Sequence, residues 1–150
     1  MDATKLLKQD HDEVRALFKE YEKAGDRAVA KKEKLAAQIC EALTVHAEIE
    51  EEIFYPAVKA ARSEEVKDEV REAVEEHKIV KTLVAEIGKM KPSDEQFDAK
   101  MTVLKESVEH HASEEEEEMF KQARKNLSKD RLEELGEEME ARKGELVEVG

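Results

Sequence analysis

Apolar residues recur every three or four positions along most of the chain, which is the spacing of one face of an α-helix. The first such segment runs from about Ala3 to Ala24, and we expect Gly25-Asp26 to break it. The second runs from about Arg27 to Tyr55, where Pro56 should stop or kink the helix because proline has no amide hydrogen. A last short turn is expected to continue to Arg62.

Two further helices follow with the same periodicity. The third is expected to begin at Ser63, whose side chain can cap it, and to end at Gly88. Ser93 followed three residues later by Gln96 has the pattern of a capping box, in which each side chain bonds the other residue's amide. The fourth helix is therefore predicted to start there and to continue to about Asn126.

The remaining residues predict a weaker helix. Ser128 is a suitable cap for a fifth helix from Lys129 to about Arg142, and the last residues are expected to fray. Because short loops join long helices, consecutive helices should lie antiparallel. The pattern predicts an all-α protein, an up-down-up-down antiparallel four-helix bundle over residues 1–126. A short fifth helix and a frayed tail, residues 127–150, should pack on the same domain.

Composition agrees with a helical domain and disfavours nucleic acid as a partner. The chain has 150 residues, of which 43% are charged, with only two prolines and five glycines. Its length is sufficient for one domain with a real core. The net charge of -13 should repel phosphate backbones, and the absence of Trp argues against stacking on bases.

The sequence also predicts where the protein works. No apolar run approaches the roughly 18 residues of a membrane span, and the N-terminus lacks the features of a signal peptide. The single cysteine, Cys40, cannot form an intrachain disulfide. The simplest interpretation is a soluble cytoplasmic protein with no membrane partner. The oligomeric state does not follow from the sequence.

A pattern of histidine and glutamate occurs twice along the chain. In each half, a lone histidine is followed 34 or 35 residues later by a second histidine, with a glutamate four residues after that. Residues four apart on a helix lie on one face, and each of these side chains falls on the apolar stripe of its helix. The six candidates are His11, His46, Glu50, His77, His111 and Glu115.

These six side chains are expected to hold metal. Their distances from the loops, at about 1.5 Å per residue, place the four histidines at a similar depth in the bundle. An unpaired carboxylate in a core is costly, and two divalent ions with bridging carboxylates would satisfy all six groups at once. Imidazole and carboxylate without thiolate suit iron or manganese, and also zinc.

Each residue alone also has an ordinary explanation. A single core histidine such as His11 is usually just hydrogen-bonded, and glutamates within a run are usually solvated. The repeated arrangement on four helices is what favours metal. His110 is expected at the surface or behind a ligand, with replacement of His111 as the alternative. Glu51 and Glu116 are expected behind the ligands or in solvent, and Tyr55 in the packed core.

The ordered motifs resemble those of the bacterial hemerythrin-like HHE cation-binding domains, over about Lys5 to Arg124. The resemblance rests on Asp10-His11, His46 to Glu50 with Phe54-Tyr55-Pro56, Glu76-His77, and His111 to Glu115 with Phe120. It implies a non-haem di-iron centre with an oxo or hydroxo bridge in a four-helix bundle. The implied ligands are the same six residues. Members of that broad family bind dioxygen, sense oxygen or iron, handle nitric oxide or break down peroxide.

The chain departs from the oxygen-carrying hemerythrins in two places. Those proteins have a second histidine four residues before the one on helix three, where this chain has Ala73, and an aspartate where it has Glu116. The resulting site is nearly symmetric and should leave more open positions, so we expect chemistry on peroxide rather than reversible dioxygen carriage. The alternatives are binding or sensing of oxygen, nitric oxide or iron without turnover, iron buffering, and a metal-free helical adaptor.

Overall fold

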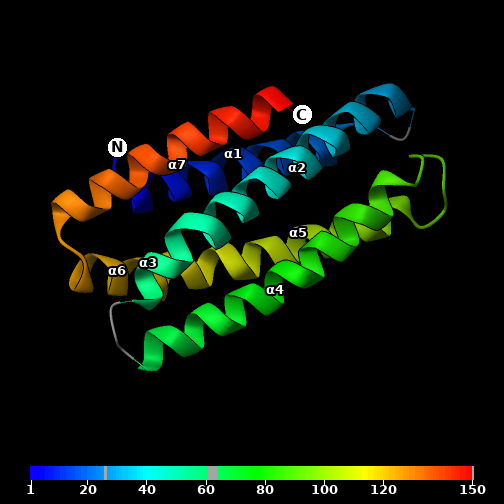
Figure 1. Ribbon diagram of the computed structural model, residues 1–150. Coiled ribbons are helices and arrows are strands. Elements are labelled where there is room, and N and C mark those ends of the chain that lie inside the picture. The colour runs from blue at the N-terminus through cyan, green and yellow to red at the C-terminus, as the bar shows by residue number, and fades with distance from the viewer. Residues whose placement is uncertain (26, 61–63, 150) are drawn as a thin grey trace.

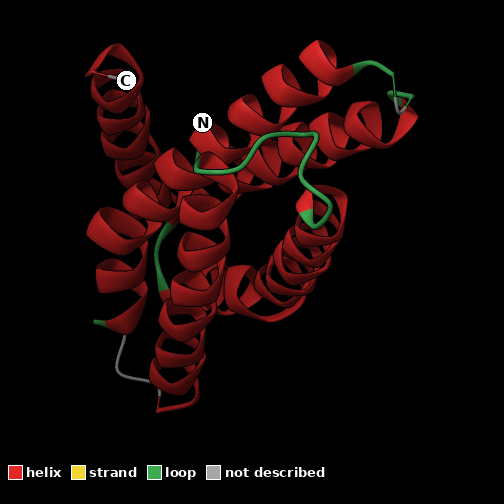
Figure 2. Ribbon diagram, turned by 90° about the vertical axis from the view of Figure 1, so that its right-hand side faces the viewer, coloured by secondary structure: helices red, strands yellow, loops and turns green. Residues whose placement is uncertain are grey.

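The computed structural model describes residues 1–25, 27–60 and 64–149, and their regular structure is entirely helical (Figures 1 and 2). Four long helical runs pack antiparallel, and a fifth helix lies along one side of them. This confirms the predicted fold class. The runs are α1 (Ala3–Lys23); α2 (Val29–Ile49), η1 (Glu50–Phe54) and α3 (Tyr55–Lys59); α4 (Glu64–Gly88); α5 (Phe97–Glu114), η2 (Glu115–Met119) and α6 (Phe120–Asn126); and α7 (Lys129–Val149).

The predicted bounds agree with the structure for α1 and for the ends of α4 and α6. Asp2 caps α1, because its side chain accepts a hydrogen bond from the Lys5 amide at 3.1 Å. Three expectations, a break at Asp26, a last turn reaching Arg62 and a cap at Ser63, fall on residues outside those that the structure describes.

Pro56 does not stop the second helical run. The chain instead passes through the π-helical segment η1, in which the Tyr55 amide bonds the carbonyl of Glu50, and it remains helical to Lys59. The second half of the chain makes the same π-helical turn at η2, with no proline near it. Proline is therefore not required for the turn. Such turns are rare and occur most often at functional sites.

The capping box predicted at Ser93 is wrong. α5 begins at Phe97, and its N-cap residue, Gln96, makes no side-chain capping bond. The preceding segment is instead a turn closed by Asp94, whose carboxylate accepts a bond from the Lys91 amide at 2.8 Å. Local bonds of this kind compete with helix formation, and here they delay the start of the helix.

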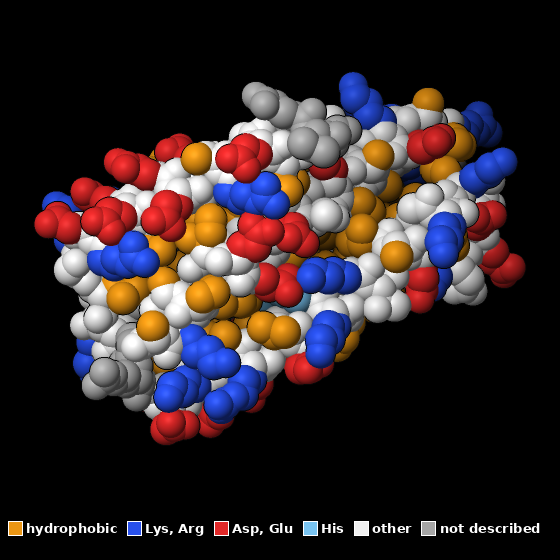
Figure 3. Space-filling model, viewed as in Figure 1, with side chains coloured by type: hydrophobic (Ala, Val, Ile, Leu, Met, Phe, Trp, Pro, Cys, Tyr) orange, Lys and Arg blue, Asp and Glu red, His pale blue; other side chains and the backbone are white. Residues whose placement is uncertain are grey.

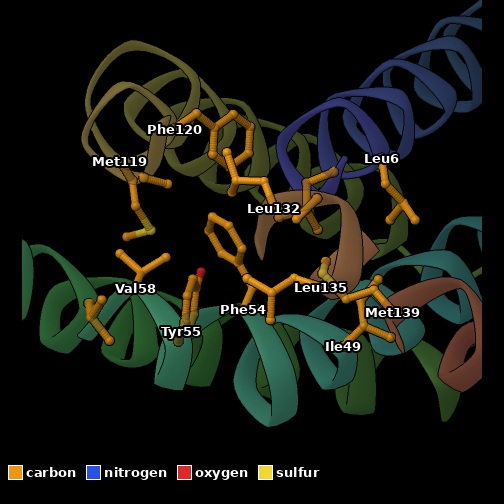
Figure 4. Close-up of a cluster of buried hydrophobic side chains, with 14 of the residues drawn as sticks. Leu6, Ile49, Phe54, Tyr55, Val58, Met119, Phe120, Leu132, Leu135 and Met139 are labelled. Atoms are coloured by element: carbon orange, nitrogen blue, oxygen red, sulfur yellow. The ribbon is translucent and has the colours of Figure 1, made fainter. Parts of the chain in front are cut away.

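The fifth helix, α7, is longer than predicted, since it extends to Val149 rather than ending near Arg142. The predicted cap is present, with the Ser128 hydroxyl accepting from the Arg131 amide at 3.1 Å. Apolar side chains of α7 join an apolar cluster of the bundle (Figure 4), and beyond Arg142 the partly buried Leu146 packs against the same cluster. The buried members from α7 are Leu132, Leu135 and Met139.

The core consists of two apolar clusters, one toward each end of the bundle. One contains Phe54, Met119, Phe120 and the α7 side chains, and the other contains Val14, Leu43, Val80 and Leu104. The candidate ligands lie between them. Figure 3 shows Asp and Glu side chains gathered over the first half of α7 and apolar side chains in the furrows between helices. Among the described helices, none has the length and apolar character needed to cross a membrane.

Candidate metal centre

The six predicted ligands converge in the middle of the bundle. Each comes from the buried face of its helix, and none is more than 8% exposed. His11 and His77 project from α1 and α4, and His46 and His111 from the last turns of α2 and α5. The glutamates follow as the first residues of the two π-helical segments. The repeated motif thus gives a nearly twofold-symmetric layer of imidazoles and carboxylates.

The ligand atoms form two triads, and each glutamate belongs to the histidine pair of the other half. Glu115 Oε1 lies 3.1 Å from His11 Nε2, within the triad that includes His46. Glu50 Oε1 lies 3.1 Å from His77 Nε2, within the triad that includes His111. Each glutamate also contacts the histidine of its own helix, at 3.0 Å for Glu50 and His46 and 3.4 Å for Glu115 and His111. Both carboxylates can therefore reach two cations.

A second layer of carboxylates surrounds the histidines, one for each ring. The four Nδ1 atoms lie 2.7 to 3.2 Å from a carboxylate oxygen on a neighbouring helix. Two of these carboxylates directly precede a lone histidine in the sequence, and two directly follow a ligand glutamate. The pairs are Glu116 with His11, Asp10 with His46, Glu51 with His77, and Glu76 with His111.

This second layer fixes which nitrogen of each ring faces the centre. A carboxylate only accepts hydrogen bonds, so Nδ1 must carry the hydrogen, and a neutral ring then presents the Nε2 lone pair to the centre. His77 Nε2 and His111 Nε2 are only 3.1 Å apart. Glu50 Oε2 is buried with no hydrogen-bond partner, and His46 Nε2 faces the carboxylate oxygen Glu50 Oε1 at 3.0 Å. The centre is a cluster of acceptors that needs protons or cations between them, and a pair of metal ions fits that need.

A third layer places a cationic or neutralising group behind each outer carboxylate. Lys143 of α7 donates to Asp10 at 2.6 Å, Lys81 lies 2.7 Å from Glu51, and Arg15 donates to Glu116 at 2.9 Å. The fourth partner is His110, whose Nε2 lies 3.4 Å from Glu76. His110 is therefore on the surface behind a ligand, and its ring is outside both triads.

Without metal, the cluster retains protons. Burial alone would lower the pKa of His46, but the charges of Glu50 and Asp10 outweigh burial and raise it to about 10. The pKa of His111 is also raised, because Glu115, Glu50 and Glu76 outweigh the effect of burial. Burial opposes ionisation of Glu50, yet His46 and His111 hold its pKa well below the usual value. Without metal, His46 and His111 are thus buried imidazolium groups paired with carboxylates.

Tyr55 belongs to the site, although the sequence analysis placed it in the packed core. Its hydroxyl donates to Glu115 Oε2 at 2.7 Å and lies 3.2 Å from Nε2 of both His77 and His111. Burial and the charges of Glu115 and Glu50 raise its pKa well above the usual value, so the phenol keeps its proton. A π turn has more residues per turn than an α turn, which keeps Tyr55 on the face of Glu50 five residues earlier.

Opposite Tyr55, the histidine layer borders a small cavity of about 30 Å³. All four histidines line it, and the other walls are mainly apolar: Val14, Leu43, Val80 and Val108, with Ala47 and Ala112. One water-sized probe needs about 10 to 15 Å³ by this measure. The cavity therefore holds a molecule of two heavy atoms, and its walls offer little to a larger polar substrate.

Sequence reasoning located the six residues of the inner layer and expected Glu51 and Glu116 either behind them or in solvent; the structure places both behind. It did not assign a role to Asp10 or Glu76. An acidic residue directly precedes the lone histidine in each half of the repeat, Asp10 before His11 and Glu76 before His77, and this repetition is a usable signal. It gave no role to Lys143. This contact depends on how α7 packs, for which the sequence carries no local sign.

Comparison with known proteins gives a consistent result. The profile of the family described as hemerythrin HHE cation binding domain matches residues 2–123. The crystal structure of a hemerythrin HHE cation-binding domain-containing protein from Mycobacterium kansasii superposes with a TM-score of 0.83 at 26% identity, covering 97% of this chain and 87% of that one. A DNA nickase from Nostoc sp. is 31% identical over 97% of this chain. The match spans 40% of that relative's length.

Proposed function

The chain belongs to the hemerythrin HHE cation-binding domain family, and from this premise we propose that it is a non-haem di-iron protein acting on a small oxidant, with hydrogen peroxide as the substrate. One observation carries the proposal. Four imidazole lone pairs and two carboxylates, all acceptors, face one another in a layer whose members are no more than 8% exposed. Protons or cations must lie between them, and two triads offer places for two ions.

The donor set narrows the choice of metal. Nitrogen and oxygen donors without thiolate suit iron, manganese and zinc, but zinc has no redox chemistry. Two iron ions, when bound, supply the two-electron exchange by which one peroxide is reduced to water and another is oxidised to dioxygen, 2 H2O2 giving 2 H2O and O2. The six inner residues would hold the ions, and the outer carboxylates keep the imidazoles oriented.

The protein's own groups support a substrate of this size. The cavity of about 30 Å³ beside the histidines accepts two heavy atoms and excludes bulky organic peroxides. Its apolar walls bring no competing ligand to the metals. On the other side of the layer, the Tyr55 hydroxyl keeps its proton and holds Glu115 in place. Tyr55 thus keeps a proton beside the inner carboxylates.

The proposal is tested by metal content and turnover measured together. Protein grown with iron should contain about two iron atoms per chain by elemental analysis, and the loaded protein should release dioxygen from peroxide. His77→Ala removes an inner ligand, and we expect it to lose both iron and turnover. Lys78→Ala is the matched control, since Lys78 directly follows His77 but its side chain is 65% exposed and lies 2.9 Å from Glu75. Circular dichroism verifies folding, and equal turnover by parent and His77→Ala would refute the proposal.

A second function, binding of oxygen, nitric oxide or iron without turnover, is favoured by one contact. Lys143 connects α7 to His46 through Asp10, so the state of the centre can affect how α7 docks. A stable optical adduct with nitric oxide and no dioxygen release from peroxide would support this function instead.

We propose no nucleic-acid partner, and the nickase name stays with the Nostoc protein. The net charge of this chain is -13, and such a surface repels a phosphate backbone. The match also leaves most of the length of that relative outside the comparison.

A further inference from the structure

The metal centre has a candidate access route beneath α7, where an outer cleft meets the inner cavity. The outer cleft has a volume of about 210 Å³ and lies between α7, α1 and α2. The inner cavity has a volume of about 30 Å³. Two residues of α1, Asp10 and Val14, line both spaces. These two side chains are therefore the part of the wall that the inner cavity and the outer cleft share.

The wall is closed at rest but thin. Val14 is 4% exposed and Asp10 is 6% exposed, so both seal the cavity. Asp10 is held in place by two hydrogen bonds, from Lys143 at 2.6 Å and with His46 at 2.9 Å. Val14 has an apolar side chain and belongs to one of the two apolar clusters. Valine in a helix strongly prefers one side-chain rotamer, so rotation of Val14 is infrequent, but it is the smallest change that joins the two spaces.

The chemistry of the outer cleft suits a small neutral molecule. Ala42, Val45 and Val147 give it apolar walls, and the opposite charges of Lys143 and Asp10 are paired with each other. Two glutamates, Glu13 and Glu41, and Gln38 complete the lining, so the cleft carries fewer carboxylates than a competing opening between α4 and α5. That opening has a volume of about 20 Å³ and touches only one ligand, His111. Five glutamates line that opening: Glu69, Glu72, Glu76, Glu114 and Glu118. Their charges make it the less suitable path for peroxide and for its anion.

We propose that small oxidants reach the metal centre through the cleft between α7, α1 and α2, and that Val14 is the gate between this cleft and the inner cavity. The inference rests on the proposed metal site, but it concerns access and not turnover. It makes Val14 a residue that controls which molecules enter and how fast, and it gives α7 a role as the outer wall of the route.

The internal repeat supplies a matched control. Val14 and Val80 each follow a ligand histidine by three residues, and both line the inner cavity. Val80 belongs to α4, which lies at the opposite edge of the bundle from α7 in Figure 1. Val14→Ala and Val80→Ala thus remove the same atoms from the same cavity, but only the first also thins the wall to the outer cleft.

The test measures nitric oxide binding to the anaerobic iron(II)-loaded protein by stopped-flow absorbance. Nitric oxide is neutral and has two heavy atoms, so it probes access without peroxide turnover. We expect Val14→Ala to raise the binding rate about fivefold, which corresponds to about 1 kcal/mol of barrier. Val80→Ala should raise it clearly less, since it only enlarges the cavity. Val14→Ile, which adds a methyl group and keeps the core filled, should slow binding.

Equal effects of Val14→Ala and Val80→Ala, or no change in Val14→Ala, would overturn the route. Melting curves identify any variant that fails to fold, and Val14→Ile then decides the question from the opposite direction. The two proposals fail separately. Nitric oxide binding that depends on Val14, with no dioxygen release from peroxide, would leave the route standing and refute the peroxide function. If the protein releases dioxygen from peroxide but Val14→Ala and Val80→Ala change the nitric oxide binding rate equally, the peroxide function stands and the route is refuted.

Discussion

Removing the Tyr55 hydroxyl tests whether this phenol is part of the site, as the structure places it, or only packs in the core. In Tyr55→Phe the ring remains, but Glu115 Oε2 loses the hydrogen bond that it accepts at 2.7 Å. Glu115 is 2% exposed, so water cannot replace the donor. A hydrogen bond to a charged group contributes about 1.5 to 3 kcal/mol. We therefore expect the metal-free protein to lose about 2 kcal/mol of its free energy of unfolding.

This loss converts into a measurable change in melting temperature. The entropy of unfolding is about 2.1 cal/mol/K per residue, or about 0.3 kcal/mol/K for 150 residues. A loss of about 2 kcal/mol then lowers Tm by about 6 °C. The assay is thermal unfolding of chelator-treated protein, followed by circular dichroism at 222 nm, a wavelength that reports helix content.

Tyr21→Phe is the control for the same chemical change. The Tyr21 hydroxyl donates to Asp98, whose side chain is 59% exposed, so water can take over the lost bond. We expect its Tm to fall by less than half as much. If Tyr55→Phe and Tyr21→Phe lower Tm equally, the Tyr55 hydroxyl is not a buried partner of Glu115, and the reasoning fails.

Four further predictions concern the histidine layers and the lone thiol. Asp10→Asn should weaken metal binding about 10- to 100-fold, as expected when a ligand histidine loses its hydrogen-bond partner. Competition with a chelator measures the affinity. The control is Asp12→Asn, which should bind metal as the parent does because the Asp12 side chain is 55% exposed. The raised pKa of His46, about 10, means that the metal-free protein keeps this ring protonated at pH 7. Metal binding needs the neutral ring, so loading at pH 7 should release at least one proton per chain into a weakly buffered indicator solution, and no release would contradict this. Because the folded pKa lies above the ordinary value of about 6.5, the stability that His46 gives the metal-free protein should be complete below about pH 6.5 and lost as pH rises through about 10. Burial raises the pKa of Cys40 to about 11, so a disulfide reagent at pH 8 should react slowly with the folded protein and quickly after denaturation; a fast reaction with the folded protein would show that the thiol is not shielded.

The sequence predicted the helices well where periodicity and simple caps decide them. The stripes of α1 and α4 follow from side-chain spacing, and Ser128 caps α7 as expected. The errors occurred where local rules competed. Pro56 was expected to stop a helix, but the π-helical segment before it lets the chain continue. The Ser93 capping box lost to the turn closed by Asp94.

For the site, the sequence identified the inner residues because the same motif occurs twice and each member lies on a buried stripe. It could not determine which carboxylate serves which ring. Asp10 precedes His11 in the sequence but binds His46 on the next helix, and Glu76 precedes His77 but binds His111. These pairings depend on how neighbouring helices are rotated and shifted against each other. Contacts between the helices determine this rotation and shift.

The sequence alone therefore determined that this protein is a helical bundle with six convergent histidines and glutamates, because helical periodicity is a local property that spacing reveals. Only the tertiary structure decided which atoms of that set face one another, that Tyr55 joins them through a π-helical turn, and that Lys143 reaches Asp10 from α7. These are contacts between segments far apart in the chain. They arise from packing the helices together, and no local stretch of sequence encodes them.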